Sequence, residues 1–455
     1  MKSRLFGSSG VRGLVNVDLT PTLAAKLGLA VVKLSKAKEV LVARDTRVSG
    51  LMLENSLVSG FLAAGANVTC LGVVPTPMLA YLVKKCSTNV GVMITASHNP
   101  SQYNGLKFFD SYGVAYDENS QNEIEKIIEN EEFELADWRK IGQAVLVDKS
   151  QSYIEKIKEA IQLRTKLHVI VDPGCGATYS LAPVILKNVG CKVTAINAQP
   201  DGFFPARSSE PNVESLKPLA RIVKEMGVDA GLAYDGDGDR VAFIDENGCF
   251  VDFDRVLAAY SAYVVKEDRG GAVVTNVEAS MCVEKMVEAQ GGKVIRTKVG
   301  DVYISEAIKR NNAVFGGEPC GAWVHPQFHY CPDGIYSSAI LLKAMEDEDK
   351  SLSEFISETP QYPTIRENIA CGNEVKCRVM ENVAEYLENA FPEFKELSNI
   401  DGVRLVLKKG WILVRASGTE PLLRLTVEGE SLNAAREIIG KGLLIVRKLV
   451  EEMRD

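Results

Sequence analysis

The chain has 455 residues, of which 46% are hydrophobic and 25% are charged, a composition typical of a soluble globular protein. A chain of this length is too long to fold around a single hydrophobic core, so we expect three or four domains. The net charge of −8 argues against a general nucleic-acid binder, and no apolar run is long enough to cross a membrane.

Ten cysteines are scattered along the chain without a C-x-x-C pair, and most lie in apolar segments such as Val68–Leu71. Buried, reduced thiols are the expected state of such residues. The stretch Met1–Arg12 is too polar to be a secretory signal. These features predict a cytoplasmic protein.

Three segments share one pattern, in which a short apolar run ends in a polar turn and is followed by a helical stretch and a second strand. The expected first strands are Val40–Asp45, Val169–Gly174 and Ala272–Asn276, and the second strands begin at Asn67, Lys192 and Lys293. Such units form right-handed crossovers in mainly parallel sheets. Three unrelated α/β folds would show the same pattern, but we expect three similar domains.

Within the first segment, the apolar run Val90–Ile94 is followed by Thr95-Ala96-Ser97-His98-Asn99-Pro100. This pattern predicts a buried strand that presents Ser97 at its end. With His98, Ser97 could be a hydrolase nucleophile, but adjacent side chains on an extended chain diverge and there is no G-x-S-x-G elbow. Ser97 could also be an ordinary serine at a strand end, or it could carry a phosphoryl group. His98 stays a candidate catalytic residue.

Two helical patterns come next, at Glu123–Trp138 and Tyr153–Ile161. The first is strongly acidic, and neither shows the strand-and-turn pattern of the repeated segments. We interpret the pair as the joint between the first and second domains.

Asp235, Asp237 and Asp239 alternate with glycines between two strand-like runs, Ala230–Ala233 and Val241–Ile244. Three carboxylates at alternate positions of a tight loop can converge on one hard cation, and an open ligand position for a phosphate oxygen suits Mg²⁺. The spacing also fits parts of an EF-hand, but Arg240 stands where that loop requires glycine. A phosphoryl group on Ser97 would complete the shell that the aspartates leave open.

Cysteine and histidine side chains gather further along the chain, at Cys320, His325, His329 and Cys331. Sulfur and imidazole ligands suit zinc, although these spacings match no standard zinc finger. Trp323 favours a packed or sugar-stacking loop instead. Zinc is therefore a minor alternative here.

The C-terminal region has a different pattern. Val403–Leu407 and Trp411–Val414 flank a Lys-Lys-Gly turn and predict an antiparallel hairpin, Leu422–Val427 adds a strand, and Leu432–Met453 reads as an amphipathic helix. A turn follows the hairpin, with the sequence Arg415-Ala416-Ser417-Gly418-Thr419-Glu420-Pro421 and Arg424 after it. It offers hydroxyl groups, a glycine N–H that a ligand can approach closely, and a guanidinium group. It is either a phosphate-binding turn or an ordinary loop between strands.

Together these motifs resemble the α-D-phosphohexomutase family over essentially the whole chain. The motifs that carry the resemblance are Gly10–Gly13, the Ser97 loop, Asn104–Lys107, the Asp235–Arg240 loop, Lys298–Asp301, Gly316–Glu318 and Arg415–Pro421. The resemblance implies three similar mixed-sheet α/β domains and a smaller C-terminal α+β domain around a central cleft. We place them at residues 1–150 (phosphoserine loop), 151–250 (metal-binding loop), 251–362 (sugar-binding loop) and 363–455 (phosphate-binding domain).

The resemblance also implies a mechanism. A phosphoryl group would move between C6 and C1 of a hexose phosphate by way of phospho-Ser97 and a bisphosphorylated sugar, with a hexose 1,6-bisphosphate as primer. Asp235, Asp237, Asp239 and Ser97 would hold one Mg²⁺, Lys107 would carry a proton, and Arg12 would stabilise charge on the transferring group. The implied substrate contacts are Arg240, Lys298, Asp301, Glu318, Cys320, Arg415, Ser417, Gly418, Thr419 and Arg424.

The substrate rests on finer comparison within the family. Lys298-Val299-Gly300-Asp301 and Gly418 look more like phosphoglucosamine mutases than phosphomannomutase/phosphoglucomutase relatives. Cys320 and Ala322 replace the serine and histidine that are common in the sugar-binding loop, which puts the substrate in doubt more than the reaction type. Glucosamine phosphate is the first choice, and glucose or mannose phosphate is the alternative.

Two other classes of function stay open, a catalytically silent sugar-phosphate sensor and a Mg²⁺-dependent phosphatase. Ser97, Lys107 and the three aspartates are all present, which argues against a sensor. The Arg415 turn favours a mutase over a phosphatase, because it would hold the end of the substrate that is not reacting. We expect a small-molecule partner only, without nucleic acid or membrane, and leave a homodimer open.

Overall fold

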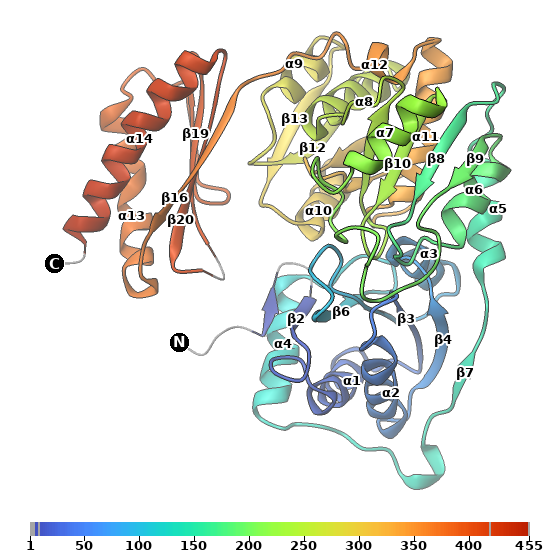
Figure 1. Ribbon diagram of the computed structural model, residues 1–455. Coiled ribbons are helices and arrows are strands. Elements are labelled where there is room, and N and C mark those ends of the chain that lie inside the picture. The colour runs from blue at the N-terminus through green and yellow to red at the C-terminus, as the bar shows by residue number, and fades with distance from the viewer. Residues whose placement is uncertain (1–4, 8–9, 418–419, 454–455) are drawn as a thin grey trace.

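The computed structural model describes residues 5–7, 10–417 and 420–453. Figure 1 shows three α/β units packed together and a fourth unit, in red, standing beside the third. Each unit is built on its own sheet. This arrangement confirms the predicted fold class of three α/β units and a smaller C-terminal α+β unit.

The first unit holds a seven-stranded mixed sheet in the order β1-β2-β6-β5-β3-β4-β7. Its strands are β1 Phe6–Gly7, β2 Gly10–Leu14, β3 Glu39–Arg44, β4 Asn67–Val73, β5 Val90–Ile94, β6 Tyr103–Phe109 and β7 Ala144–Leu146. Its helices are α1 Pro21–Ser35, α2 Gly50–Ala63, α3 Thr76–Lys85 and α4 Glu118–Glu129. β5 lies between β3 and β6, and all five of its residues are buried.

The second and third units each hold a four-stranded sheet, in the orders β11-β10-β8-β9 and β13-β12-β14-β15. The second unit comprises α5 Ser150–Ala160, β8 His168–Asp172, α6 Leu181–Asn188, β9 Lys192–Ala195, α7 Lys217–Met226, β10 Ala230–Tyr234 and β11 Val241–Asp245. The third comprises α8 Phe253–Glu267, β12 Ala272–Asn276, α9 Cys282–Glu288, β13 Lys293–Thr297, α10 Asp301–Asn311, β14 Phe315–Gly317, β15 Trp323–Val324, α11 Gly334–Glu348 and α12 Leu352–Phe355. In all three repeats the second strand runs parallel to the first, as predicted.

The fourth unit is a five-stranded antiparallel sheet in the order β16-β20-β19-β18-β17. It comprises β16 Thr364–Ala370, α13 Asn373–Ala390, β17 Glu396–Ser398, β18 Val403–Leu407, β19 Gly410–Ala416, β20 Leu422–Gly429 and α14 Leu432–Glu452. The predicted hairpin, third strand and amphipathic helix are confirmed as β18–β19, β20 and α14. None of the helices in the described ranges is long and apolar enough to cross a membrane.

The apolar cores divide the molecule unevenly. One large cluster joins side chains of the first three units, including Met78 on α3, Tyr153 on α5 and Ile335 on α11. The fourth unit has a separate core and contacts the third through a small cluster centred on Val277 and Trp411. The first three units therefore form one packed body, whereas the fourth depends on a modest interface for its position.

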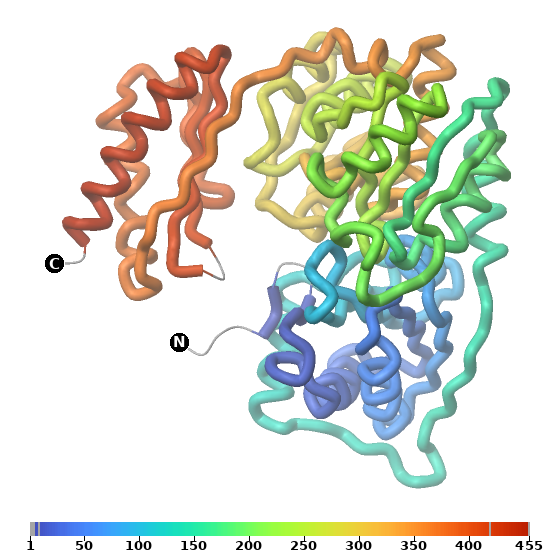
Figure 2. The backbone as a smooth tube through the Cα atoms, viewed as in Figure 1, coloured from blue at the N-terminus to red at the C-terminus, as the bar shows by residue number. Residues whose placement is uncertain are grey.

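The predicted helix Glu123–Trp138 is wrong in both extent and role. α4 begins at Glu118, after the capping side chain of Asp117, and ends at Glu129. Glu131 then adopts a left-handed φ of 52°, which stops a helix. α4 packs in the first unit through buried Ile124 and Ile127, and an extended segment runs along the outside of that unit to α5 (Figure 2). Only α5 lies at the joint.

A cavity of about 390 Å³ between the third and fourth units is lined by a partly buried carboxyl group, that of Asp254 at the start of α8. Asp254 accepts the Ser280 N–H at 2.7 Å. Burial, helped by Asp252 and Glu428 and partly offset by Arg366, raises the pKa of Asp254 to about 7. The folded protein therefore keeps a proton that the unfolded chain releases above about pH 4.

This raised pKa predicts that Asp254→Asn stabilises the protein at alkaline pH. Wild-type stability should fall as the pH rises from about 4 to about 7, by at most about 4 kcal/mol, because the unfolded state binds fewer protons in that window. The variant should match the wild type near pH 4 and unfold at a higher temperature at pH 8. Thermal midpoints of both proteins at the two pH values check this, and parallel pH profiles would contradict it.

Candidate active site

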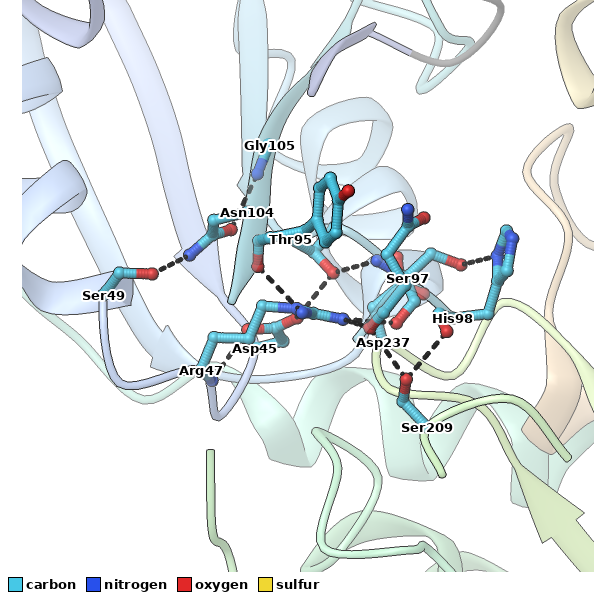
Figure 3. A network of polar contacts seen from close by, with 12 residues as sticks. Asp45, Arg47, Ser49, Thr95, Ser97, His98, Asn104, Gly105, Ser209 and Asp237 are labelled. Atoms are coloured by element: carbon cyan, nitrogen blue, oxygen red, sulfur yellow. Dashed lines mark hydrogen bonds and ion pairs between the residues drawn. The ribbon is translucent and has the colours of Figure 1, made fainter. Parts of the chain in front are cut away.

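Ser97 lies just beyond β5, in a loop that folds back instead of continuing the strand (Figure 3). Its φ angle is 51°, and its backbone N–H donates to the hydroxyl oxygen of Thr95 at 2.8 Å. The residue is only 1% exposed, and Ser97 Oγ donates to Asp235 Oδ2 at 2.6 Å. The loop of the first unit thus directs its hydroxyl at the aspartate loop of the second.

The expectation that Ser97 and His98 diverge is wrong. Because Ser97 is left-handed and not extended, the two side chains turn toward each other, and Ser97 Oγ lies 3.3 Å from His98 Nδ1. Burial and then the nearby cations Arg240, Arg12 and Lys107 lower the pKa of this imidazole to about 2. The ring is therefore neutral at ordinary pH, and its catalytic role stays a prediction.

Asp235, Asp237 and Asp239 occupy the loop that joins antiparallel β10 and β11. Gly238 has a φ of 75°, which glycine adopts without strain, and its N–H donates to Asp235 Oδ1 at 3.0 Å. A Cβ on Gly236 would lie 2.5 Å from the carbonyl oxygen of Ser97. The glycines thus let the loop fold tightly and approach the Ser97 loop closely.

Lys107 on β6 reaches this loop from the first unit. Its Nζ lies 2.8 Å from Asp237 Oδ2 and 2.6 Å from Asp239 Oδ2. The side chain is buried, since the residue is only 3% exposed. Burial alone would lower the pKa of Lys107, but Asp237 and Asp239 raise it above its ordinary value. The ammonium group is therefore charged at neutral pH.

The three aspartates meet the requirements of a magnesium site. Their ligand oxygens lie within 4.8 Å of one another, and burial together with the neighbouring carboxylates raises the pKa of Asp235 well above its usual range. Asp237 Oδ1 and Asp239 Oδ1 are buried without a hydrogen-bond partner. A hard divalent cation would give these two oxygens a partner, because carboxylate oxygens are its preferred ligands.

Other predicted residues surround this cluster. The Nη1 group of Arg12 on β2 donates to Asn99 Oδ1 at 3.2 Å, and Asp237 and Asp239 act electrostatically on its guanidinium. Arg240 lies near Cys320 of the third unit, whose interaction with it helps raise the Arg240 pKa against the lowering effect of burial. The first three units therefore each contribute side chains to one centre.

Glu318 closes the centre from the third unit. Its buried Oε1 accepts the Asn276 side-chain amide at 2.8 Å and the Gly300 N–H at 2.9 Å. Burial is the main cause that raises the pKa of Glu318, and Asp301 adds to it. Lys298, which lies in the same motif as Gly300, does not join this centre. Its Nζ lies 3.6 Å from Glu118 Oε1 on α4. It lines a separate cavity of about 450 Å³.

The cysteines and histidines considered for zinc do not converge. His325 pairs with the hydroxyl of Ser337, and His329 pairs with Asp333. Over the described ranges, the three aspartates are the only set of at least three such side chains whose ligand atoms come together. The loop is a packed one, as Trp323, which is fully buried, indicates.

The Arg415 turn lies in the fourth unit and is only partly described, since Gly418 and Thr419 fall outside the described residues. Arg415 forms ion pairs with Glu278 of the third unit and with Asp401. Arg424 is half-exposed and pairs with Glu420. In the part of the turn that the structure describes, no hydrogen bond or ion pair reaches Ser97 or the aspartates.

Several residues that hold these loops have no counterpart among the sequence predictions. Lys376 on α13 donates to the carbonyl oxygens of Ser417 and Glu420 at 2.6 and 2.7 Å. Thr76 donates its N–H to the carbonyl oxygen of Asp237 at 2.9 Å. Arg47 and Ser209 bind the Ser97 loop. Of these, only Arg47 had a sequence signal, because it follows the first predicted strand within the polar run Asp45-Thr46-Arg47.

Profiles of four protein domains match the chain. They are described as phosphoglucomutase/phosphomannomutase alpha/beta/alpha domains I, II and III and the C-terminal domain, and they match residues 3–135, 151–248, 252–362 and 374–441. Relatives described as probable phosphoglucosamine mutases include one from Methanopyrus kandleri, 43% identical over 99% of this chain and 100% of the relative. Another, from Pyrococcus furiosus, is 41% identical over 99% of both chains.

Solved structures resemble the whole chain as well. A phosphoglucomutase/phosphomannomutase family protein from Burkholderia thailandensis superposes with a TM-score of 0.88 at 26% identity, covering 98% of this chain and 97% of that one. A putative phosphomannomutase from Thermus thermophilus gives a TM-score of 0.81 at 26% identity and covers 99% of this chain and 100% of that one. The similarity thus includes the arrangement of all four units.

Proposed function

The chain belongs to the phosphoglucomutase/phosphomannomutase family of phosphosugar mutases, and we propose that it interconverts glucosamine 6-phosphate and glucosamine 1-phosphate. The observation that carries the proposal is the Ser97 hydroxyl, which lies 2.6 Å from a carboxylate of a buried three-aspartate cluster. Relatives described as probable phosphoglucosamine mutases, more than 40% identical over nearly their whole length, support the choice of sugar.

In the proposed reaction, phospho-Ser97 transfers its phosphoryl group to the free hydroxyl of the sugar phosphate. The bond between phosphorus and Ser97 Oγ breaks as the bond to the sugar oxygen forms, which leaves a bisphosphorylated sugar. After this intermediate turns around, its other phosphoryl group returns to Ser97. A hexose 1,6-bisphosphate would load Ser97 at the start.

We assign the proton transfers to Lys107, which is charged at neutral pH. Its ammonium group would donate a proton to the oxygen that leaves phosphorus and recover one from the hydroxyl that attacks. Arg12 and Arg240 add positive charge beside the same cluster, where charge on the transferring group would develop.

We propose that Asp235, Asp237 and Asp239 hold one Mg²⁺. When bound, the ion neutralises charge on the phosphoryl group that is transferred. The buried Oδ1 atoms of Asp237 and Asp239, which lack a hydrogen-bond partner, support this assignment. A cytoplasmic location stays a prediction.

Glu318 and Cys320 are the proposed contacts with the sugar ring. The carboxylate of Glu318 is fixed by two donors, while Cys320 offers a weak donor where the family motif commonly has a serine. The test is a side-by-side kcat/KM for the 1-phosphates of glucosamine, glucose and mannose, with Mg²⁺ and a trace of hexose 1,6-bisphosphate. We expect the amino sugar to be preferred by at least tenfold, and a preference for glucose or mannose would contradict the proposed substrate.

The same assay separates the two other classes of function. A sensor would turn over none of the three sugars. A phosphatase would release inorganic phosphate faster than it forms the 6-phosphate. The mutase proposal requires that isomerisation exceed phosphate release.

The fourth unit suggests how substrate affinity is set. Arg415, the proposed phosphate ligand, is paired with Glu278 across the interface, and the two side chains are 21% and 30% exposed. A substrate phosphate must therefore compete with this carboxylate. Asp401, which also accepts the Val299 N–H at 3.1 Å, pairs with the same guanidinium.

We therefore expect Glu278→Gln to lower KM for glucosamine 1-phosphate by about three- to tenfold with little change in kcat, because a partly exposed ion pair is worth about 1 kcal/mol. Glu284→Gln is the matched control, since it breaks a pair with Arg296 that does not include the Arg415 turn. Steady-state kinetics of both variants decide. An unchanged or higher KM in Glu278→Gln would show that the ion pair does not compete with substrate.

A further inference from the structure

Arg47 is a fully buried arginine around which the Ser97 loop is wrapped (Figure 3). Its Nε donates to Asp45 Oδ2 at 2.9 Å. Its other donors point to backbone carbonyl oxygens of the loop, at 2.8 Å for Ser97, 2.6 Å for Asn99, 2.6 Å for Pro100 and 2.8 Å for Tyr103. The guanidinium thus binds the beginning, middle and end of the loop at once.

The carboxylate that pairs with Arg47 also fixes the loop. Asp45 Oδ2 accepts the hydroxyl of Thr95 at 2.6 Å, and Thr95 Oγ1 accepts the backbone N–H of Ser97 at 2.8 Å. Ser97 is therefore held through both its N–H and its carbonyl oxygen. These contacts stabilise its left-handed φ of 51°, which costs a residue other than glycine roughly 1 kcal/mol or more.

The second unit completes the support. The hydroxyl of Ser209 lies 2.8 Å from the carbonyl oxygen of His98 and 2.9 Å from that of Asn99. The centre of the Phe204 ring lies 5.2 Å from the Arg47 guanidinium carbon. Arg47 therefore stands where the loop of the first unit meets the unit that carries the three aspartates.

We propose that Arg47 is a positioning residue for phosphoryl transfer, which fixes the direction of Ser97 Oγ relative to Asp235, and that Ser209 assists it from the second unit. The proposal rests on the proposed function of Ser97. The guanidinium binds the backbone of the reacting residue and touches neither substrate nor the transferred group. A displacement of the reacting oxygen by about 1 Å is enough to cost roughly 10²-fold in rate.

Lysine at position 47 keeps the charge but cannot make five directed hydrogen bonds. Arg47→Lys should therefore lower kcat by about 10²-fold and slow the phosphorylation of Ser97 by glucose 1,6-bisphosphate to a similar extent. The KM for glucosamine 1-phosphate and the Mg²⁺ concentration for half-maximal activity should stay within about threefold, because the three aspartates and the proposed sugar contacts are unchanged. A purely structural role would instead reduce the amount of folded protein and leave kcat per active site intact.

Arg255→Lys is the matched control, because Arg255 also donates to backbone carbonyl oxygens, those of Thr359 and Ile356, but remote from Ser97. It should keep wild-type kcat. Ser209→Ala is a gentler second variant that leaves Arg47 in place, and we expect its kcat to fall by about three- to tenfold at unchanged KM.

Circular dichroism and thermal midpoints establish which variants are folded. The proposal is overturned if folded Arg47→Lys keeps kcat within about twofold of wild type, or if Arg255→Lys loses as much. Should Arg47→Lys not fold, Ser209→Ala decides, and an unchanged kcat there overturns the proposal. Failure of the proposed function is recognised separately, because the wild-type protein would then isomerise no hexose phosphate.

Discussion

Replacement of Ser97 by alanine should abolish mutase activity while the protein stays folded. We expect kcat to fall by at least about 10⁴-fold, because the nucleophile that carries the phosphoryl group is removed. The loss of one buried hydrogen bond, from Ser97 Oγ to Asp235 Oδ2, should cost no more than about 3 kcal/mol of stability. The two effects are separable by steady-state assay and thermal unfolding.

Ser101→Ala is the matched control for this variant, since Ser101 lies in the same loop but beyond Pro100. It should retain wild-type turnover. The Ser97 variant should also fail to take up phosphate from a hexose 1,6-bisphosphate. Turnover of Ser97→Ala within tenfold of wild type would contradict the mechanism.

Asp235→Asn should have the second-largest effect. Removal of one of three clustered carboxylates should lower kcat by about 10³-fold and weaken Mg²⁺ binding, because the ion loses a charged ligand.

In the absence of Mg²⁺, the same change should raise the unfolding temperature. The reason is that burial and the neighbouring carboxylates raise the pKa of Asp235, so its ionised form is unfavourable in the metal-free protein.

The measurement is the unfolding temperature with and without Mg²⁺. Wild type should gain stability from the ion, whereas the variant should start higher and gain little. Asp245→Asn serves as control, because Asp245 ends the same hairpin but binds the N–H groups of Asn247 and Cys249. A variant that binds Mg²⁺ as tightly as wild type would contradict the proposed site.

The sequence predicted what depends on local pattern. Three features could be recognised from a few neighbouring residues, and the structure contains all of them. They are the buried run Val90–Ile94, the alternation of aspartate and glycine from Asp235, and the hairpin around Gly410. The sequence also predicted that Ser97 and the aspartates lie together, because a phosphoryl group on Ser97 would complete the ligand shell that the three carboxylates leave open.

Long-range support could not be predicted in this way. Arg47 binds carbonyl groups about 50 residues away, and Lys376 binds the Arg415 turn from about 40 residues away. Backbone carbonyls carry no sequence signature, so such contacts leave no pattern to read. The left-handed Ser97 is a further example, since nothing local showed that the chain would bend and bring His98 to the hydroxyl.

Side chains at an interface between units were equally hard to predict. Arg415 was expected to bind a phosphate, but it pairs with Glu278 of the third unit, and this contact depends on how the third and fourth units dock. The helix expected to continue to Trp138 failed for a different reason. Glu131 adopts a left-handed φ just after Glu129, and Leu135 and Trp138 in the expected continuation stay exposed, so packing does not stabilise a helix there.

The central claim is that Ser97 shuttles a phosphoryl group to and from the sugar. The most direct measurement loads the dephosphorylated protein with labelled glucose 1,6-bisphosphate and Mg²⁺, maps the label by mass spectrometry, and then adds glucosamine 1-phosphate. We predict one labelled phosphoryl group per chain, on Ser97, which passes to the sugar and appears in glucosamine 6-phosphate. Label on another residue, or label that leaves Ser97 only as inorganic phosphate, would contradict the account.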